Sequence, residues 1–461
     1  MERTKEQCRM SDDEGDPGTR VLLISTGAWR DDNNSGSTRT NLFGAWPSEN
    51  IAQIYCSHEQ PANPVCRSYF QISDRMLLRS ILTRRSGGSA IHVASAEGSS
   101  TAAHRGRPLE GPVYGFLRRY RSSALLLVRE MLWSVSAWRS RELESYIHDF
   151  SPDVLFVSLC DSVYLNRLIQ HVAATTGKPL ALFCSDDVFA DSSGEASVIR
   201  GAYRRALRKA INETVGRCDR LYVISHKQKE EYDSLFAVES RVLFKGGNFA
   251  SFGGQRQRRD GPLRLVFAGN ITSGRWRTLA EIGTVLRRVN AGGVKARLHI
   301  YTHSPLTRGM RMAMDIPGAV AIEGGVPSQQ VRQTLLGADI LVHVESFELR
   351  DRIATRLSFS TKLVDYFESG RCIFAVGWDQ AASIEYLVRN DAAVVATRSE
   401  DVEPKLRALI DSPQLILDYG RKAWECGRRN HQLERIRDTL YRDLFHLANM
   451  PPKSAIAREL A

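Results

Sequence analysis

The sequence of 461 residues contains no CxxC pair and no long apolar run. Its eight cysteines are scattered, which is typical of buried thiols in a reducing compartment rather than of disulfides or a zinc site. No apolar segment approaches the roughly 20 residues that span a bilayer, and residues 1–19 are polar and acidic, unlike a secretory signal. We therefore expect a cytoplasmic protein, with contact at the inner face of the plasma membrane left open.

Patterns of metal and nucleophilic catalysis are lacking as well. None of the 11 histidines lies in a metal-ligand spacing such as HxxxH with a carboxylate, and no Ser-His-Asp arrangement is visible. What the sequence does have is an excess of positive charge, +11, which indicates nucleic acid, anionic lipid or a phosphate-bearing substrate as partner. Because no helix-turn-helix or aromatic RNA platform is present, we expect no nucleic-acid partner.

The length predicts two domains, because a single core rarely grows beyond about 250–300 residues. Apolar strands alternate with helices twice along the chain, a pattern typical of parallel sheets covered on both faces. The expected strands include Val21–Ser25 and Leu180–Cys184, and helical patterns lie around Asn41–Ala45 and over Tyr114–Phe150. The sequence predicts an α/β fold of two Rossmann-like, doubly wound domains with a cleft between them. The expected segments are a polar tail (1–19), a first domain (20–250), a linker (251–262), a second domain (263–430), and a final helix that crosses back, with its tail (431–461). Residues 79–107 are interpreted as a long loop or poorly ordered insertion.

The most informative motif is SFSTK, which lies at the expected start of a helix in the second half. Ser360, Thr361 and Lys362 would combine hydroxyls, unpaired backbone N–H groups and a lysine at a helix N-terminus, which favours anions. Asp365 follows about one turn later, where a carboxylate can accept hydrogen bonds from ribose hydroxyls. A simple helix cap with a solvent-exposed lysine is the alternative.

A second motif, FAGNITSGRWR, begins at Phe267 at the end of another apolar strand. Gly269 and Asn270 end that strand, and Arg275 and Arg277 follow in a polar loop that we expect to precede a helix over Thr278–Val289. Glycine lets the backbone approach a ligand, and arginine is suited to holding a diphosphate. The two motifs together predict a phosphate site at one edge of the second sheet.

These motifs carry a resemblance to a known family. From Phe267 to His446 the chain resembles the C-terminal domain of glycosyltransferases with the GT-B fold, closest to family 4. The matching segments are Gly269, Arg275, the turn Gly324-Gly325-Val326, the strand Asp339–His343, and the helix Thr361–Gly370 with the strand Cys372–Val376 after it. The first half matches more loosely, through Pro152–Phe156 and Arg220–Ser225. The resemblance implies retaining transfer of a sugar from a nucleotide-diphosphate sugar to an acceptor hydroxyl, without a metal or other cofactor.

The resemblance also assigns residues, with departures. The family's two basic phosphate ligands fall on Asn270 and Arg275, so Arg277 or Lys362 is expected to supply the missing charge. The second of the family's two glutamates falls on Asp365, but the first falls on Leu357. Glu345 or Glu348, just past the Asp339–Val344 strand, is therefore expected to contact the donor sugar. The candidate catalytic residues are Arg275, Lys362 and Glu345; the other candidate donor contacts in this half are Gly269, Asn270, Arg277, His343, Ser360, Thr361 and Asp365.

In the first half, three residues are candidates for the same cleft. Gly36, in the polar loop after the first strand, resembles the glycine that lets this loop approach the donor diphosphate. Asp161 and Asp187 follow two further strands, where either can orient an acceptor hydroxyl. A helix cap or turn residue is the alternative for each aspartate.

The stretch Tyr114–Arg141 carries six arginines against one acid, together with Trp133 and Trp138. Such a helix can contact an anionic membrane or a lipid-linked acceptor, and ordinary packing on the sheet is the alternative. The expected role is surface-polysaccharide or glycolipid assembly, with a sugar or lipid-linked acceptor. Asn270 and Leu357 keep open a catalytically impaired scaffold, and a GT-B-like epimerase or phosphorylase is the other rival. A phosphorylase would normally need a lysine-bound pyridoxal phosphate, and no such site is evident.

Overall fold

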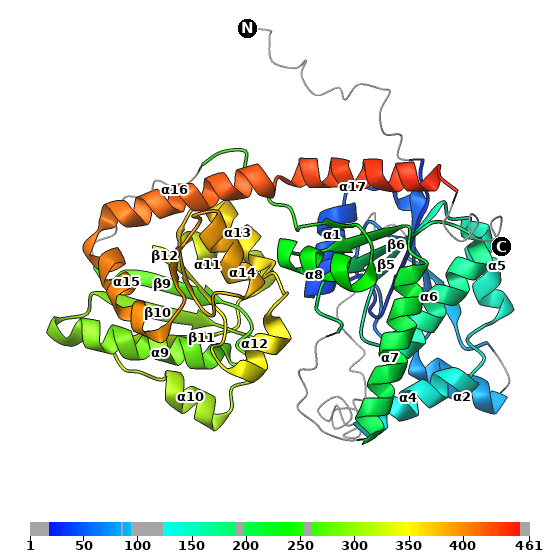
Figure 1. Cartoon of the computed structure of the whole chain (residues 1–461), viewed down its shortest axis with the longest axis horizontal. Coiled ribbons are helices and arrows are strands. Elements are labelled where there is room, and N and C mark those ends of the chain that lie inside the picture. The colour runs from blue at the N-terminus through cyan, green and yellow to red at the C-terminus, as the bar shows by residue number, and fades with distance from the viewer. Residues whose placement is uncertain (1–17, 84–85, 94–122, 190–197, 253–260, 452–461) are drawn as a thin grey trace, which may run out of the picture.

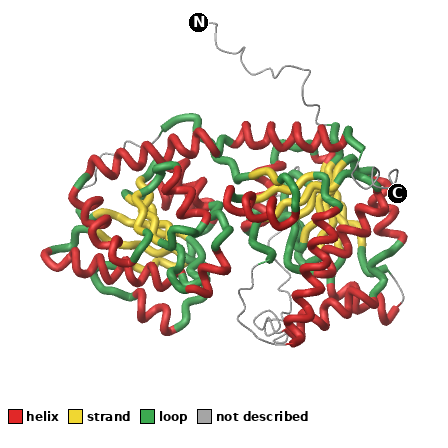
Figure 2. The backbone as a smooth tube through the Cα atoms, in the orientation of Figure 1, coloured by secondary structure: helices red, strands yellow, loops and turns green. Residues whose placement is uncertain are grey.

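The computed structural model describes residues 18–83, 86–93, 123–189, 198–252 and 261–451. In these ranges two β-sheets and their helices form two domains that lie side by side (Figure 1). Helices surround the strands of each sheet, as the backbone view in Figure 2 shows. Seven cysteines fall within the described residues; all are free thiols and six of them are buried.

The first sheet has the strand order β4-β3-β2-β1-β5-β6-β7-β8, with every pairing parallel except that of β3 and β4. Alternate residues of β1 pack into two different hydrophobic clusters, Val21 and Leu23 into one, Leu22 and Ile24 into the other. Both faces of this sheet are therefore buried, which explains its near-continuous apolar strands. The strands are β1 (Val21–Ser25), β2 (Ile51–Tyr55), β3 (Ser68–Gln71), β4 (Ser89–His92), β5 (Val154–Ser158), β6 (Leu180–Cys184), β7 (Arg220–Val223) and β8 (Ser240–Val242).

Three expectations about the first domain are corrected. The first helix begins at Asn34, because Asn33 caps it, and not near Asn41. The segment 79–107 contains the end of a helix and strand β4, while residues 94–122 lie outside the described residues. The helical stretch 114–150 forms two helices in its described part, interrupted at residues 136–140. The helices are α1 (Asn34–Phe43), α2 (Asp74–Thr83), α4 (Ser123–Val135), α5 (Arg141–Phe150), α6 (Val163–Thr176), α7 (Val198–Gly216) and α8 (His226–Phe236).

The second sheet has six parallel strands in the order β11-β10-β9-β12-β13-β14. The prediction of two doubly wound α/β domains is confirmed. Its strands are β9 (Leu263–Ala268), β10 (Ala296–Tyr301), β11 (Val320–Gly324), β12 (Ile340–Val344), β13 (Cys372–Val376) and β14 (Val394–Ala396). Its helices are α9 (Arg275–Val289), α10 (Arg308–Met314), α11 (Ser328–Leu336), α12 (Leu349–Thr355), α13 (Lys362–Ser369), α14 (Ala382–Arg389), α15 (Ser399–Asp411) and α16 (Pro413–Asn430), with α17 (Leu433–Ala448) after them.

The strand order reverses at one point in each sheet, between β1 and β5 and between β9 and β12. In doubly wound sheets the ligand crevice opens at this switch point, beyond the carboxyl ends of the strands. The pairing of β9 with β12 covers only Leu265 with Ile340 and Val266 with Leu341, so the two strands are unpaired toward their carboxyl ends. The topology therefore directs attention to the residues that follow β9 and β12.

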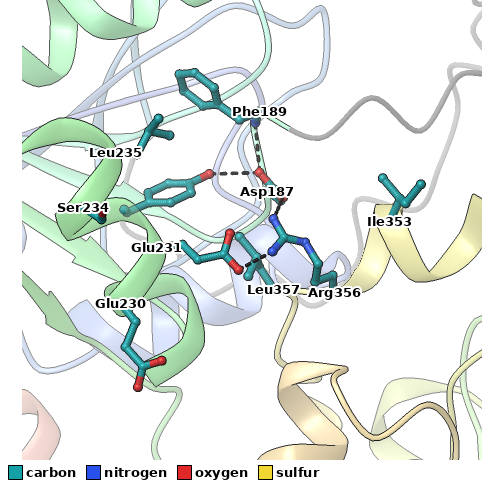
Figure 3. Close-up of a pocket in the computed structure, with 10 residues that line it drawn as sticks. Asp187, Phe189, Glu230, Glu231, Ser234, Leu235, Ile353, Arg356 and Leu357 are labelled. Atoms are coloured by element: carbon teal, nitrogen blue, oxygen red, sulfur yellow. Dashed lines mark hydrogen bonds and ion pairs between the residues drawn. The ribbon is translucent and has the colours of Figure 1, made fainter.

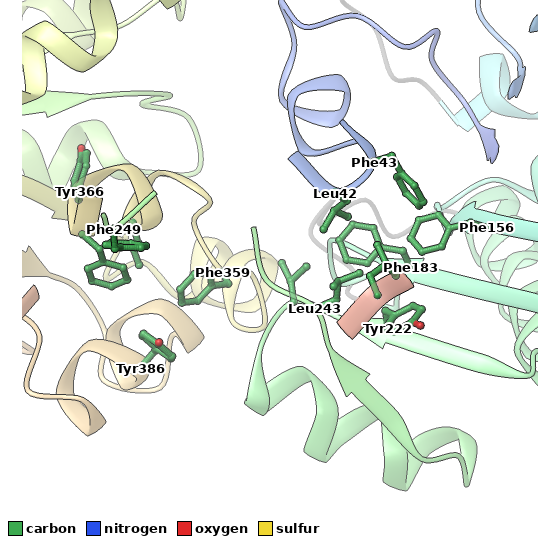
Figure 4. Packing of buried hydrophobic residues seen from close by; sticks show 14 of the residues in the cluster. Leu42, Phe43, Phe156, Phe183, Tyr222, Leu243, Phe249, Phe359, Tyr366 and Tyr386 are labelled. Carbon is green, nitrogen blue, oxygen red and sulfur yellow. The ribbon is translucent and has the colours of Figure 1, made fainter. Parts of the chain in front are cut away.

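The chain crosses between the domains twice, once in the segment between β8 and β9 and again between α16 and α17. Asn41 of α1 exchanges two hydrogen bonds with the backbone of Gly246, and α17 packs against α1 and β5 of the first domain. One hydrophobic cluster continues from the first sheet into the second domain, where Phe359 and Tyr386 belong to it (Figure 4). The rings of Phe359 and the fully buried His431 stack with centroids 5.8 Å apart. The loop that precedes α13 is thus anchored at the domain junction.

Candidate active site

An ion pair occupies the switch point of the second sheet. Arg275, the first residue of α9, places its Nη2 atom 3.0 Å from both carboxylate oxygens of Glu345, which directly follows β12. Burial raises the pKa of Glu345, although the Arg275 guanidinium opposes that shift. Because this carboxylate is almost completely buried and bound to Arg275, it orients the guanidinium, and its contact with a donor sugar stays a prediction.

Lys362, the first residue of α13, lies beside the same pair. A Cβ atom on Gly269 would be 2.0 Å from Nζ of Lys362, so the amine lies directly against the backbone at this strand end and a larger residue there would displace it. Burial, followed by the charge of Arg275, lowers the pKa of Lys362 to about 8. Two cations at the starts of two helices therefore lie near one carboxylate, and this excess of positive charge favours an anion.

His343, inside β12, adds a neutral group to this cluster. Its Nε2 atom lies 3.0 Å from Oγ of Ser383 and 3.8 Å from Glu345. Burial, then the charges of Arg275 and Lys362, lowers its pKa to about 3. The imidazole is therefore uncharged at neutral pH and serves the site as a hydrogen-bonding group.

Asp365 lies on α13 one turn after Lys362, as expected, and meets a residue that sequence reasoning missed. Nζ of Lys245, from the segment that follows β8, is 2.6 Å from Oδ1 of Asp365. Ser360 and Thr361 precede the helix, and Thr361 occupies the N-cap without a side-chain capping bond. The structure therefore does not support the alternative that the Thr361 hydroxyl only caps the helix.

A cavity of about 310 Å³ opens beside Asp365 and joins the two domains. Ser328 and Arg332 of α11 and Glu368 of α13 line it from the second domain. From the first domain it is lined by the loop after β1 and the start of α1, through Asp31, Asp32, Asn33 and Ser37. Its carboxylates would repel phosphate but can accept hydrogen bonds from hydroxyl and N–H groups. The cavity thus suits a neutral polar group next to the cationic cluster.

The structure does not bring Arg277 into this cluster. The sequence predicts Arg275 and Arg277 in a loop, but α9 already begins at Arg275. Residues two apart on a helix do not share a face, and Arg277 is exposed with its guanidinium over the ring of Trp276. Asn270 accepts hydrogen bonds from the backbone N–H of Thr272 and from Ser304, which fixes the loop after β9. Lys362, and not Arg277, is the second positive residue of the cluster around Glu345.

The prediction that Gly36 lies in the loop after β1 is wrong. It lies in the first turn of α1, where its N–H donates to the side chain of Asn33 at 2.8 Å. A Cβ atom at this position would be 1.7 Å from the carbonyl oxygen of Arg30, so close packing against that backbone requires glycine. Ser37, the next residue, is the one that lines the interdomain cavity.

Leu357, which stands where the resemblance expects a glutamate, packs across the domain boundary. It is 1% exposed and belongs to the hydrophobic cluster of the first domain. Its carbonyl oxygen accepts a hydrogen bond from Ser225 Oγ at 2.9 Å. Glu348, the other residue considered for the sugar contact, is exposed at the N-cap of α12. The side chain at position 357 thus serves domain packing.

A second cavity, of about 520 Å³, lies between the domains next to Leu357 (Figure 3). Asp187, expected near the acceptor, lines it and accepts hydrogen bonds from Tyr232 and the backbone of Phe189. Arg356, which sequence reasoning missed, reaches into the same space and forms ion pairs with Asp187 and Glu231. Its partners lie more than 100 residues away, so no local pattern indicates this contact.

Asp161, the other acceptor candidate, is exposed after β5, and its backbone carbonyl accepts a hydrogen bond from Tyr203. Desolvation and then the charges of Asp161 and Asp187 raise the pKa of Asp186. The carboxylates at the ends of β5 and β6 are therefore neighbours. Across the described part of the chain, no group of three or more His, Cys, Asp or Glu side chains is arranged to hold a metal ion.

Comparison with known proteins gives the fold. No protein-family model matches the chain, and no curated protein matches its sequence. Sucrose-phosphate synthase from Thermosynechococcus elongatus is similar over 93% of this chain and 99% of its own, with a TM-score of 0.61 at 12% identity. HepE from Anabaena, solved with UDP, matches over 93% and 100%, with a TM-score of 0.59 at 8% identity.

A third similar structure is the UDP-forming α,α-trehalose-phosphate synthase from Burkholderia xenovorans, solved with glucose-6-phosphate. It covers 92% of this chain and 99% of its own, with a TM-score of 0.55 at 11% identity. At such identities the likeness establishes architecture: the chain has the two-domain GT-B fold, with α/β domains built mainly on parallel strands.

Proposed function

We propose that this protein is a glycosyltransferase that moves a sugar from a nucleotide-diphosphate sugar to an acceptor hydroxyl. The observation that carries the proposal is that two cations, Arg275 and Lys362, lie close together at the switch point, beside the cavity that Asp365 lines. The two cations suit a diphosphate, and the acidic cavity suits the ribose and base. UDP in the similar HepE structure supports a nucleotide ligand for this fold.

In the proposed mechanism Arg275 and Lys362 bind the diphosphate and stabilise the negative charge that grows on it as the sugar leaves. The bond between the sugar C1 atom and the phosphate oxygen breaks, and a bond from C1 to the acceptor oxygen forms on the same face. The acceptor proton passes to the departing phosphate oxygen, so configuration is retained without a protein base. Glu345 positions Arg275, and the positive side chains do the work that this mechanism would otherwise assign to a metal.

The cavity beside Asp187 is the proposed acceptor site. Its carboxylates and the Phe189 and Tyr232 rings suit a polyhydroxylated group. We further propose a sugar or lipid-linked acceptor in surface-polysaccharide or glycolipid assembly, with peripheral contact to an anionic membrane. The net charge of +11 supports that contact, and no helix in the described ranges is long and apolar enough to cross a bilayer.

A binding protein without transferase activity is the second candidate, and Leu357 favours it. A buried leucine cannot replace a carboxylate that would hold the sugar, whereas the diphosphate cluster does not depend on that position. Nucleotide binding without sugar transfer would be the outcome of this arrangement.

Incubation with a panel of radiolabelled nucleotide sugars separates the two functions. Release of the nucleoside diphosphate with transfer of label supports the enzyme. Arg275→Ala should abolish this turnover, whereas Arg277→Ala, a matched change on the exposed side of α9, should retain it. Equal loss in both variants, or no turnover of any donor by the wild type, would contradict the proposal.

A further inference from the structure

The first domain carries a large exposed apolar surface on three neighbouring helices. On α4, the side chains of Val128, Met131 and Val135 are 62%, 66% and 65% exposed. On α2, Leu78 and Leu82 are 55% and 85% exposed. Such a concentration of exposed apolar side chains on helices that pack against one another is unusual on a soluble domain and marks an interaction site. We call these five residues, together with Ile81, Leu127, Val198 and Ile199, the apolar face.

Hydrogen bonds hold α2 and α4 side by side. Asp74 at the start of α2 accepts hydrogen bonds from Arg129 and from the indole of Trp133 on α4. Ser80 of α2 accepts a hydrogen bond from the backbone of Ala137, just beyond α4. α4 also packs against α7, whose first residues belong to the face (Figure 1).

The spacing within α4 explains why a continuous stripe results. Val128, Met131 and Val135 follow each other at intervals of three and four residues, so they lie on one side of the helix. Trp133 points the other way and is buried against Tyr164, with ring centroids 4.4 Å apart. The tryptophans expected to reach a membrane are therefore core residues, since Trp138 is buried too. The exposed side chains available for a membrane contact are those of Val128, Met131 and Val135 instead.

The charges around the apolar face are mainly positive. Helices α2, α4 and α7 carry eight basic and three acidic residues in total. Two of the three acids are engaged inward, Glu130 with the backbone of Val163 and Asp74 with Arg129, a pair that also takes up one of the eight cations. Arg75 and Arg79 are exposed on α2 between its apolar residues. Apolar side chains flanked by cations complement an anionic lipid surface, where the former enter the acyl region and the latter meet the headgroups.

We propose that the apolar face docks the protein onto a bilayer of anionic phospholipid. The inference deepens the membrane contact named in the proposed function and identifies the residues that make it. It can fail while nucleotide-sugar transfer stands, because donor binding is measured without vesicles.

Co-sedimentation of the full chain with vesicles tests the proposal. The probes are vesicles of phosphatidylcholine alone and of an equimolar mixture of phosphatidylcholine and phosphatidylglycerol. The wild type should bind the mixed vesicles, bind less as salt rises, and bind phosphatidylcholine weakly. Met131→Glu should lower the fraction bound to mixed vesicles by about tenfold or more, because a charge replaces a side chain that enters the bilayer.

Met312→Glu is the matched control, because Met312 is also an exposed methionine, 69% accessible, but lies on α10 of the second domain. It should bind vesicles as the wild type does. Equal binding by the two glutamate variants, or no binding by the wild type, would overturn the proposal. A concentration-dependent dimer in sedimentation velocity that Met131→Glu abolishes would instead assign the face to a second copy of the chain. Both variants are surface changes, and unaltered circular dichroism confirms that they fold.

Discussion

Nζ of Lys245 lies 2.6 Å from Oδ1 of Asp365, which joins the chain crossing after β8 to the helix that begins the proposed diphosphate site. The pair engages one carboxylate oxygen of Asp365, a residue that also lines the cavity of about 310 Å³ between the domains. Lys245 also belongs to the junction itself, because its carbonyl lies near the ring of the buried His431. The position of the proposed ribose contact is therefore set by contacts at the domain junction.

Ribose recognition is the first prediction. Asp365→Asn and Lys245→Met should each reduce the preference for a ribonucleoside diphosphate over its 2′,3′-dideoxy form, by about tenfold for the aspartate variant. Calorimetric titration of the same nucleotide in both sugar forms measures the ratio. If Lys245→Met lowers the affinity for both nucleotide forms but leaves the ratio of the two affinities unchanged, Lys245 has only a structural role. An unchanged ratio in Asp365→Asn would exclude Asp365 as the ribose contact.

Nucleotide affinity should fall as pH rises above 8. In the ligand-free protein the pKa of Lys362 is about 8, lowered by burial and then by Arg275, so the amine loses its charge above that pH. The wild type should lose up to about tenfold in affinity per pH unit there. Lys362→Arg keeps its charge and should bind with an affinity that changes little between pH 8 and 10. The same decline in both proteins would exclude Lys362 as the titrating group.

The free energy of unfolding should change with pH in the direction opposite to nucleotide affinity, rising as Lys362 loses its proton. Its folded pKa of about 8 lies below the ordinary 10.5, so between these values the unfolded chain holds a proton that the folded protein has lost. Stability from this group therefore rises with pH through that window. At pH 7 Lys362→Met should raise the ligand-free free energy of unfolding by about 1–3 kcal/mol.

Urea denaturation at pH 7 and pH 10.5 measures this effect, and the advantage of the methionine variant should shrink at the higher pH. Destabilisation by Lys362→Met at pH 7 would contradict the account of a desolvated lysine kept for binding.

Leu357→Glu tests what position 357 does. Because the side chain is buried in the hydrophobic cluster of the first domain, an unpaired carboxylate there should cost about 3–5 kcal/mol of stability. Leu357→Met, which keeps the volume, should cost less than about 1.5 kcal/mol. Chemical denaturation compares the two. A glutamate variant that is as stable as the wild type and has higher transferase activity would show that the position faces the sugar.

Much of the fold was predictable because its strands are short apolar runs buried on both faces. Val21–Ser25 and Leu180–Cys184 have in the structure the bounds that the sequence indicates. Strand β4 was not predicted, because its four residues include Ser89 and His92 and are mostly exposed at the sheet edge. The start of α9 was misplaced by three residues, since Gly274 caps it without any side-chain signal.

The site residues that lie at the same edge of the second sheet were predictable. Gly269, Arg275 and Lys362 follow strands or begin helices at the same switch point, so a motif and its position suffice to bring them together. Arg277 was misassigned because the helix start decides which way each arginine points. Lys245 and Arg356 carry no local signal, since each pairs with a carboxylate more than 100 residues away across the domain junction.

The most direct test of the central claim is thermal unfolding of the wild type and Lys362→Met with a panel of nucleoside diphosphates. Binding to the folded state alone raises the free energy of unfolding by about 2.7 kcal/mol at a hundredfold excess over Kd. We predict that one nucleoside diphosphate raises the Tm of the wild type and leaves that of Lys362→Met nearly unchanged. No increase with any member of the panel, or an equal increase in both proteins, would contradict a diphosphate site at Arg275 and Lys362.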